Sequence, residues 1–584
     1  MTISAAVFSA GRRSGQIGWA VAALGGVVIL CNAFVVYFVG QEHFIYSFDY
    51  SNYWIHYREL GASLVDHPFS ALLSVAVSIR NTYNLWPVLP MTPFEWLLGP
   101  GRLAYILAIT NLYVLPGAVL LALFAQEALW PKRRPDGHPA LQLALVAASI
   151  LLLHPLWVPV LRGYPDVVGI VAIATILLLH FTTPFAGQKL KSLVATGLLL
   201  CVLVVLRRWY LFWVVAFFPA ALMAHGLEIY QQHGLAWRRY LATGRNATIV
   251  GLVFVVSMAA FAAPLAWKIV RTDYADIYSA YRTSSSLLEV AGLMPGYFGW
   301  AILIVSVSGL IWLAVRRETR VAGLFLITQS IIIFVLFART QDFGIHHYLL
   351  LFPAVALGVA AVVINLSAKI TDAFWRTASV GLVVAVLLAS SGAVFAPQAA
   401  GLSALGSFVP KERTYPLVRN DISVVHRLLD RLGDLEQRQP GDIYVVASSY
   451  HILNSEIVTN GCTIGPPQRS FCDRILVTND VDKRDGFPRQ FLHASYVVVA
   501  DPPQYHLRPT DQRVIGVLAR ELTAGHGIGA SFQRLSDEFR LDDGVTVSLY
   551  AKVRPFEKAD LAALTAEFTG YYPDRKSMFT ITDD

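Results

Sequence analysis

Long apolar runs separated by short polar segments dominate the first two thirds of the chain. The runs lie at about 17–39, 103–125, 140–160, 166–182, 192–206, 209–226, 246–268, 298–315, 321–338, 347–366 and 377–396. A helix of about 20 apolar residues crosses the roughly 30 Å of hydrocarbon in a bilayer. The pattern therefore predicts a polytopic α-helical membrane protein with about 11 transmembrane helices.

The pattern changes near residue 397 to that of a soluble domain. Short runs rich in Val, Ile and Tyr predict strands at DIYVVASS, RILVTN, YVVVAD and VTVSLYAKV. Helical spacing is present at 420–434, 510–523 and 558–569. We therefore expect a transmembrane domain at 1–396 and a soluble α/β domain at 397–584.

The placement of Lys and Arg predicts the orientation of the chain. At 55% hydrophobic and 15% charged residues, the composition excludes a soluble globular protein. With the N-terminus inside, the basic loop residues fall on the inner side, as the positive-inside rule requires. They are Arg12, Arg13, Lys132, Arg133, Arg134, Lys189, Lys191, Arg238, Arg239, Arg245, Arg316, Arg317, Arg320, Lys369 and Arg376. The net charge of +7 is thus a topology signal and not a nucleic-acid footprint, and the C-terminal domain is expected outside.

The four cysteines divide into two kinds. Cys31 and Cys201 lie within apolar runs and are expected to pack as small apolar residues. Cys462 and Cys472 lie close together in the domain expected outside, where an oxidising compartment favours a disulfide. The alternative, a metal pair, lacks further Cys or His at ligand spacing.

An acidic residue follows the first apolar run. Asp49 stands among aromatic residues in SFDYSNYWIHYREL, at the start of a long outer loop. Two interpretations are open: a solvated residue in an aromatic-rich interface, or a carboxylate at the mouth of a membrane cavity that acts as a base. The same loop contains two short apolar segments at 67–79 and 92–99, which predict helices lying in the membrane surface.

Three further outer segments carry charges at the expected membrane boundary. In the second outer loop, Arg162 and Asp166 either pair with each other or present a second acidic group. Arg207 and Arg208 lie between two short apolar runs with no acidic neighbour in sequence. They either extend to lipid headgroups or form an anion site. Before the tenth run, Arg339, His346 and His347 add cationic groups. Together these segments predict a site for a lipid phosphate.

The order of these motifs resembles that of glycosyltransferase superfamily C (the GT-C fold). The motifs are FDYSNYW after the first span, RGYPD before a new span, LRRWY between two short spans, and HHYLLLFP late in the membrane part. The resemblance covers the membrane domain and implies an integral membrane enzyme that uses lipid-phosphate-linked sugars. It also implies a bacterial cytoplasmic (inner) membrane location.

The resemblance implies roles for the charged residues. Asp49 would be the catalytic base, and Arg207, Arg208, Arg339, His346 and His347 would bind the donor phosphate. Asp166, Arg162 and Glu42 would form a second group that binds the acceptor or a cation. Unlike many relatives, the chain has no second acid beside Asp49, and Glu42 lies seven residues earlier. A divalent cation therefore stays an open alternative, and no nucleotide cofactor is expected.

The expected function is inverting transfer of a sugar from a polyprenyl-phosphate donor to a glycan, lipid or protein acceptor on the outer side of the membrane. The enzyme would be a hexosyl- or pentosyltransferase of cell-envelope polysaccharide biosynthesis, with membrane lipids as further partners and no nucleic acid. Two alternatives remain: a polytopic transporter or flippase, and a polymerase or ligase of lipid-linked glycans.

Overall fold

The computed structural model describes residues 14–81, 83–129, 139–181, 183–370, 372–464 and 470–582. The expected inner residues Arg12, Arg13, Lys132, Arg133 and Arg134 lie outside these ranges. The chain is mostly helical with a small C-terminal sheet. It divides into two compact units. The membrane unit contains Met1–Gly40, Tyr53–Thr272 and Ser284–Pro416, and the C-terminal unit contains Gln41–Asn52, Asp273–Thr283 and Leu417–Asp584.

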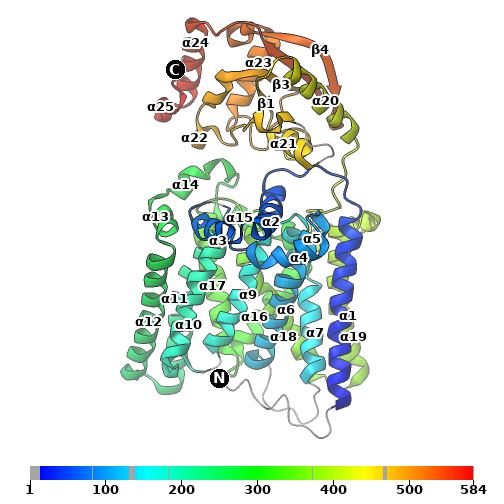
Figure 1. Cartoon of the computed structure of the whole chain (residues 1–584). Helices are drawn as coiled ribbons and strands as arrows, with labels where there is room; N and C mark the ends of the chain where they lie inside the picture. Colours follow the sequence, from blue (N-terminus) through cyan, green and yellow to red (C-terminus); the bar gives the residue numbers. More distant parts are fainter. Residues whose placement is uncertain are drawn as a thin grey trace. The chain divides into compact units, whose positions relative to one another are not determined.

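The membrane unit is a bundle of apolar helices, in which α16 packs on α18, α11 on α17 and α10 on α12 (Figure 1). Its helices are α1 (Ser14–Val39), α2 (Asp49–Asp66, whose first four residues belong to the C-terminal unit), α3 (Pro68–Val77), α4 (Thr92–Leu98), α5 (Arg102–Ile109), α6 (Leu115–Phe124), α7 (Pro139–Leu151), α8 (His154–Leu161), α9 (Val168–Phe181), α10 (Leu190–Leu206), α11 (Leu211–His233), α12 (Trp237–Phe261), α13 (Ala263–Arg271), α15 (Leu287–Phe298), α16 (Trp300–Val315), α17 (Arg320–Ala338), α18 (Phe352–Lys369) and α19 (Ala373–Phe395).

Within the described residues, six helices are long and apolar enough to cross a membrane, or eight spans if each of two bent pairs counts as one. The first pair joins α7 and α8 at 57°, where prolines follow the break. The second joins α15 and α16 at 107° through Gly299, whose φ of +73° a side chain would disfavour. The remaining expected runs correspond to the shorter helices Pro165–Phe181, Leu190–Leu206 and Phe352–Ser367. The chain is thus an integral membrane protein, whereas a count of 11 spans stays a prediction.

The first long loop forms three helices. The two segments expected to lie in the membrane surface are helical in α3 and α4, and both leave large apolar side chains exposed, such as Phe69 and Leu97. The sequence alone did not predict α2. Its Trp54 indole donates to the carbonyl of Pro100 at 2.9 Å, and the Trp96 indole of α4 donates to the Gly61 carbonyl of α2 at 3.0 Å.

The C-terminal unit contains a five-stranded mixed sheet in the order β2-β1-β3-β5-β4. Strand β1 pairs parallel with β2 and β3, and β5 pairs antiparallel with β3 and β4. Helices α20 and α21 pack in one apolar core and α23 and α24 in the other. The elements are β1 (Asp442–Val446), β2 (Ile475–Leu476), β3 (Ala494–Asp501), β4 (Phe532–Arg540), β5 (Thr546–Lys552), α14 (Tyr274–Ile277), α20 (Ile422–Arg438), α21 (Ser455–Ile464), α22 (Asp482–Asp485), α23 (Arg513–Ala524), α24 (Lys558–Tyr571) and α25 (Lys576–Phe579).

The four predicted strands and three predicted helices are all present in this unit. The sequence alone did not predict β4, FQRLSDEFR, because charged side chains interrupt the alternation of apolar and polar residues that is typical of a strand. Such charges are typical of an edge strand, where they discourage pairing with another chain.

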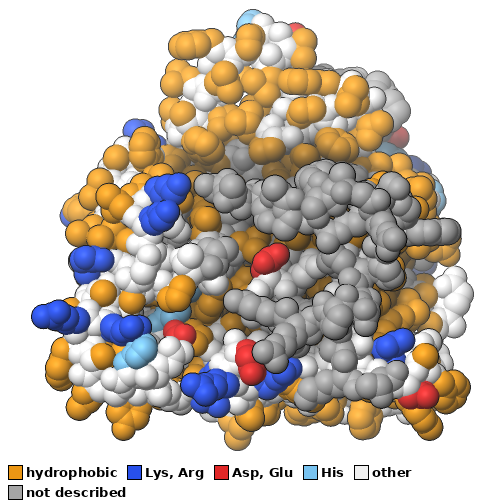
Figure 2. Space-filling model, turned by 90° about the horizontal axis from the view of Figure 1, so that it is seen from below, with side chains coloured by type: hydrophobic (Ala, Val, Ile, Leu, Met, Phe, Trp, Pro, Cys, Tyr) orange, Lys and Arg blue, Asp and Glu red, His pale blue; other side chains and the backbone are white. Residues whose placement is uncertain are grey.

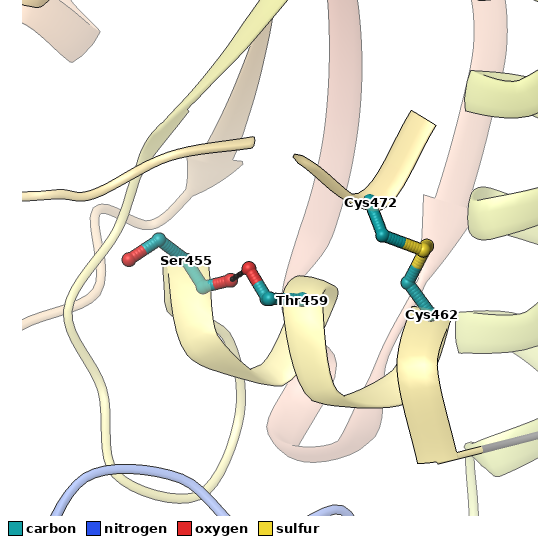
Figure 3. The surroundings of a disulfide bond; sticks show 4 residues. All are labelled: Ser455, Thr459, Cys462 and Cys472. Carbon is teal, nitrogen blue, oxygen red and sulfur yellow. Dashed lines mark hydrogen bonds between the residues drawn. A yellow bond between two sulfur atoms is a disulfide. The ribbon is translucent and has the colours of Figure 1, made fainter. Parts of the chain in front are cut away.

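A disulfide joins Cys462, near the end of α21, to Cys472 (Figure 3). Its Cα atoms are 5.8 Å apart. This is the pair that the sequence singled out. In the same helix, the Thr459 hydroxyl donates to the Ser455 carbonyl at 3.0 Å, which continues the helical turn toward the bridge (Figure 3).

One end of the membrane unit carries basic side chains. Figure 2 shows Lys and Arg spread around the rim of the face seen from below, with few acidic side chains between them. The described loop residues that the positive-inside rule assigns to the inner side include Lys189, Lys191, Arg238, Arg239, Arg245 and Arg317, and all six are exposed.

Candidate functional site

A buried ion pair links two segments of the membrane unit that the sequence pattern predicts to lie on the outer side. Helix α10 ends at Leu206, and Arg207 follows with an extended backbone. Its Nε donates to Oδ1 of Asp166 at 2.7 Å, and both side chains are only 4% exposed. The pairing of Asp166 with Arg162, one of the two sequence interpretations, is therefore wrong. The Arg162 Nη2 instead donates to the carbonyl of Tyr415 at 2.8 Å.

Aromatic rings enclose this ion pair. The Arg207 guanidinium lies 5.3 Å from the centre of the Tyr53 ring and 5.6 Å from that of Tyr83, and its Nη1 donates to the Tyr53 hydroxyl at 3.1 Å. The Tyr210 hydroxyl donates to the Asp166 main-chain carbonyl at 2.7 Å. This ring crosses Gly169, where a Cβ would lie 2.1 Å from the ring, so only glycine allows the approach.

The side-chain hydrogen bonds of the pair involve Arg207 Nε and Nη1 and Asp166 Oδ1. Of its carboxylate atoms, Asp166 Oδ2 is buried with no hydrogen-bond partner among the described residues. Arg207 already has a carboxylate, a hydroxyl and two rings around it. These contacts hold Asp166 beside the end of α10, and the predicted part of Arg207 in phosphate binding stays a prediction.

Arg208 differs from Arg207 in its surroundings. It is half-buried, and its guanidinium lies 4.9 Å from the centre of the Trp209 ring. Lys268, an exposed residue of α13, lies near enough that the charge of Arg208, after burial, contributes to lowering the Lys268 pKa. A cation whose pKa is lowered by a neighbouring positive charge is favoured by a bound anion. The sequence alone did not single out Lys268, because a lysine on the polar face of an amphipathic helix is common at a membrane surface.

The two histidines lie beside these arginines. The ring of His347 contacts Trp209 at 4.9 Å, edge to face, and its Nδ1 accepts from the Gly344 N–H at 3.2 Å. His346 stacks on Tyr164 at 4.5 Å, and its Nδ1 is buried without a hydrogen-bond partner in the described structure. Burial lowers the pKa of both imidazoles, and the charges of Arg207 and Arg208 lower the pKa of each further. Both shifts favour the neutral form of the rings.

Arg339 shows no contact with this group among the described residues. It follows the last residue of α17 and is exposed. In the part of the chain that the structure describes, its side chain has no hydrogen bond or ion pair to the other candidate residues. Its predicted role in phosphate binding therefore has no geometric support.

The remaining acidic candidates belong to the C-terminal unit. Glu42 accepts hydrogen bonds from the Tyr46 hydroxyl at 2.5 Å and from the Leu417 N–H at 3.2 Å, which is a structural role. Asp49 is the first residue of α2, where a carboxylate is stabilised by the helix dipole. Its negative charge contributes to raising the pKa of Tyr450 and of Glu456.

No group of three or more His, Cys, Asp or Glu side chains that could hold a metal occurs among the described residues. The metal dependence left open by the sequence thus stays open.

No protein-family model and no curated protein sequence matches the chain. The chain is similar to two crystal structures of ArnT from Cupriavidus metallidurans. The first, bound to undecaprenyl phosphate, matches with a TM-score of 0.46 and 14% identity, and the second, in the apo state, with 0.45 and 15%. Each match covers 92% of this chain and 98% of the other. ArnT is a lipid-phosphate-dependent glycosyltransferase of the GT-C family, the family that the sequence resembles. At this level of similarity the match carries no argument about activity, which rests on the residues of this chain.

Proposed function

We propose that this protein is an inverting glycosyltransferase that moves a sugar from a polyprenyl-phosphate donor to a hydroxyl of an acceptor on the outer side of the membrane. The observation that carries the proposal is that Arg208 and His347 both lie 4.9 Å from the Trp209 ring, with the His346 ring 3.9 Å from that of His347. Lys268 lies near enough to Arg208 to belong to the same group. These residues come from separate outer segments of the chain, and they are the kinds of side chain that hold a phosphate.

The chemistry requires that negative charge be stabilised on the leaving phosphate. When the bond from the sugar to the phosphate breaks, its electron pair stays on the phosphate oxygen. Arg208 and Lys268 stabilise this charge, and such preorganised groups are worth more in a site that excludes water. A bound phosphate also makes protonation of His346 and His347 more favourable, because it offsets the two arginines.

The acceptor hydroxyl needs a base. We assign this role to Asp49, the carboxylate that opens α2, as the sequence pattern suggested. The hydroxyl oxygen forms the new bond to the sugar carbon while its proton passes to the Asp49 carboxylate. One displacement of this kind inverts the configuration at that carbon. Asp166 is removed from this role, since its carboxylate is occupied by Arg207.

Sidedness is part of the proposal. We assign the basic end of the membrane unit (Figure 2) to the cytoplasm, because the positive-inside rule favours that side. The C-terminal unit is assigned to the outer side from the order of the apolar runs in the sequence. A disulfide in the C-terminal unit fits the same side.

The test is an assay of purified protein in vesicles with a panel of polyprenyl-phosphate sugars. Release of free polyprenyl phosphate with formation of a glycosylated acceptor is the expected result. Release of polyprenyl diphosphate would indicate a polymerase or ligase of lipid-linked glycans, and movement of intact donor across the bilayer without cleavage would indicate a flippase. Either of these outcomes would contradict the proposal.

A further inference from the structure

The segment that precedes α2 belongs to the C-terminal unit, and hydrogen bonds join it to residues far away in the sequence. The His43 N–H donates to the Leu417 carbonyl at 2.9 Å. The Asn460 amide donates to the Tyr46 carbonyl at 2.7 Å, and the Asn454 amide donates to the Ser47 hydroxyl at 3.0 Å. Residues hundreds of positions away in sequence thus fix the backbone that leads into Asp49.

The residue directly before Asp49 has an unusual backbone. Phe48 has a φ of +50°, one of two positive values among the described residues other than glycine. A bulky side chain in this region is a genuine outlier, and such residues persist only where the surroundings enforce them, commonly at functional sites. The Phe48 ring packs against Tyr450 at 4.7 Å and His506 at 5.4 Å, both in the C-terminal unit.

A single carboxylate holds the Phe48 backbone from the other side. Oε2 of Glu456, at the start of α21, accepts from the Phe48 N–H and lies 3.5 Å from the Ser51 hydroxyl in the first turn of α2. It thereby provides a partner for a backbone donor at a helix start, where such groups otherwise lack one. The contact joins positions that are 408 residues apart.

The use of a carboxylate here is electrostatically costly. Burial, together with the nearby negative charges of Asp480 and Asp49, raises the pKa of Glu456 to about 7. Asp480 is in turn paired with Arg484, at 3.5 Å. An amide at position 456 could accept the same hydrogen bond without repelling Asp49. The acceptor is therefore the feature that the geometry requires, and the charge is incidental to it.

We propose that Glu456 is a positioning residue for the transfer reaction: by holding the Phe48 backbone it sets the direction of the Asp49 carboxylate. This deepens the proposed function and rests on Asp49 being the base. In this proposal the C-terminal unit holds Phe48 in a backbone conformation with positive φ, which a bulky residue rarely adopts without such support.

The test compares Glu456→Ala with Glu456→Gln in the full-length protein. Loss of the acceptor in Glu456→Ala is expected to lower kcat roughly 10- to 100-fold with KM for the donor unchanged, since a displacement of about 1 Å can cost about 100-fold. Glu456→Gln keeps the acceptor and is expected to retain kcat within about threefold. Glu436→Ala, which removes a carboxylate paired with Arg474 in the same unit, is the control and should keep full activity.

A double-mutant cycle separates positioning from general destabilisation. In an Asp49→Asn background, Glu456→Ala should reduce the residual rate less than about twofold, because there is no base left to position. An equal loss in both backgrounds, or equal losses for Ala and Gln, would overturn the proposal. If Asp49→Asn itself keeps the wild-type rate, the assignment of the base fails, and Glu456 loses this role with it.

Should Glu456→Ala not be recovered folded, Glu456→Asp replaces it in the comparison. This variant keeps the charge but shortens the side chain by one methylene, so it should lower kcat while Glu456→Gln does not. Full activity of Glu456→Asp combined with loss in Glu456→Gln would show that the charge matters and would overturn the proposal.

Discussion

Arg207 and Asp166 form a buried ion pair, with Nε and Oδ1 2.7 Å apart and both side chains 4% exposed. Two charges that share an almost water-free position stabilise each other, and the loss of either one leaves the other without compensation. We infer that Arg207 stabilises the fold through this pair, so phosphate binding is best tested at its neighbour Arg208, where a substitution leaves the pair intact.

The first prediction is that Arg207→Ala destabilises the protein by about 3–5 kcal/mol, because it leaves Asp166 buried and unpaired. Thermal unfolding of the purified protein in detergent measures this loss. Arg339→Ala, which removes an exposed arginine at the end of α17, should leave the unfolding temperature unchanged. Equal unfolding temperatures for the two variants would show that the ion pair contributes little.

Arg208→Ala is expected to keep the stability of the protein and to weaken binding of polyprenyl phosphate by about 10- to 100-fold, the range of one or two charged hydrogen bonds. Arg208→Lys should rescue poorly, because an ammonium cannot bind phosphate in a bidentate manner. Lys268→Ala should have a smaller effect in the same direction, since Lys268 is more exposed.

Arg271→Ala is the matched control for Lys268, because Arg271 lies on the same helix with its guanidinium 3.9 Å from the centre of the Trp267 ring. Binding is measured with labelled polyprenyl phosphate in detergent micelles. If Arg208→Ala binds as tightly as the wild type, Arg208 anchors the protein to lipid headgroups instead.

The C-terminal unit should lose stability as pH rises from about 4 to about 7. Burial raises the pKa of Asp482 to about 7, of Asp480 to about 6 and of Glu456 to about 7. The folded unit therefore binds more protons than the unfolded chain across this range, and by linkage its stability is highest below the unfolded pKa values.

Hydrogen exchange of β3 amides, converted to opening free energies at each pH, measures this slope. In the wild type, the Val514 N–H and the Tyr572 hydroxyl donate to Oδ2 of Asp482 at 2.9 and 2.8 Å. The Asp482→Asn variant keeps an oxygen that can accept both hydrogen bonds, and its side chain is neutral at every pH. The slope should be shallower in this variant. A stability that rises with pH over the same range would contradict the raised pKa values.

Orientation is tested by a reporter enzyme fused after residue 400, which should be active only when exported from the cytoplasm. Cytoplasmic activity of the fusion would overturn the proposed sidedness.

In the full-length protein, mass spectrometry without reduction should detect the Cys462–Cys472 bridge. Its loss in Cys462→Ser should lower the free energy of unfolding by about 3 kcal/mol on the chain-entropy model.

Much of this structure could be predicted from local patterns in the sequence. Apolar runs identified the helices, Val-rich runs identified β1, β2, β3 and β5, and two nearby cysteines identified the bridge. The charged loop residues also predicted an anion site, which stays a prediction, although Arg207 and Arg208 do lie near His346 and His347.

Contacts between distant positions could not be predicted in this way. Proximity in sequence favoured Arg162 as the partner of Asp166, yet the partner is Arg207, which is 41 positions away. The contact of Glu456 with Phe48 spans 408 positions and depends on the folding of the whole C-terminal unit. Lys268 gave no sequence signal, because an interfacial lysine is ordinary until its neighbour in space is known.

The role of Asp49 as the catalytic base is tested most directly by the turnover of Asp49→Asn in vesicles, with a polyprenyl-phosphate sugar that the wild type uses. The substitution preserves size and removes the base, so kcat should fall by about 100- to 10,000-fold with donor binding intact. Asp49→Glu should keep a small part of the activity, and Glu42→Gln should be far less affected, since Glu42 accepts hydrogen bonds from the Leu417 N–H and the Tyr46 hydroxyl, for which a glutamine oxygen can also serve. A near wild-type kcat for Asp49→Asn would contradict the assignment, and with it the mechanism proposed for this protein.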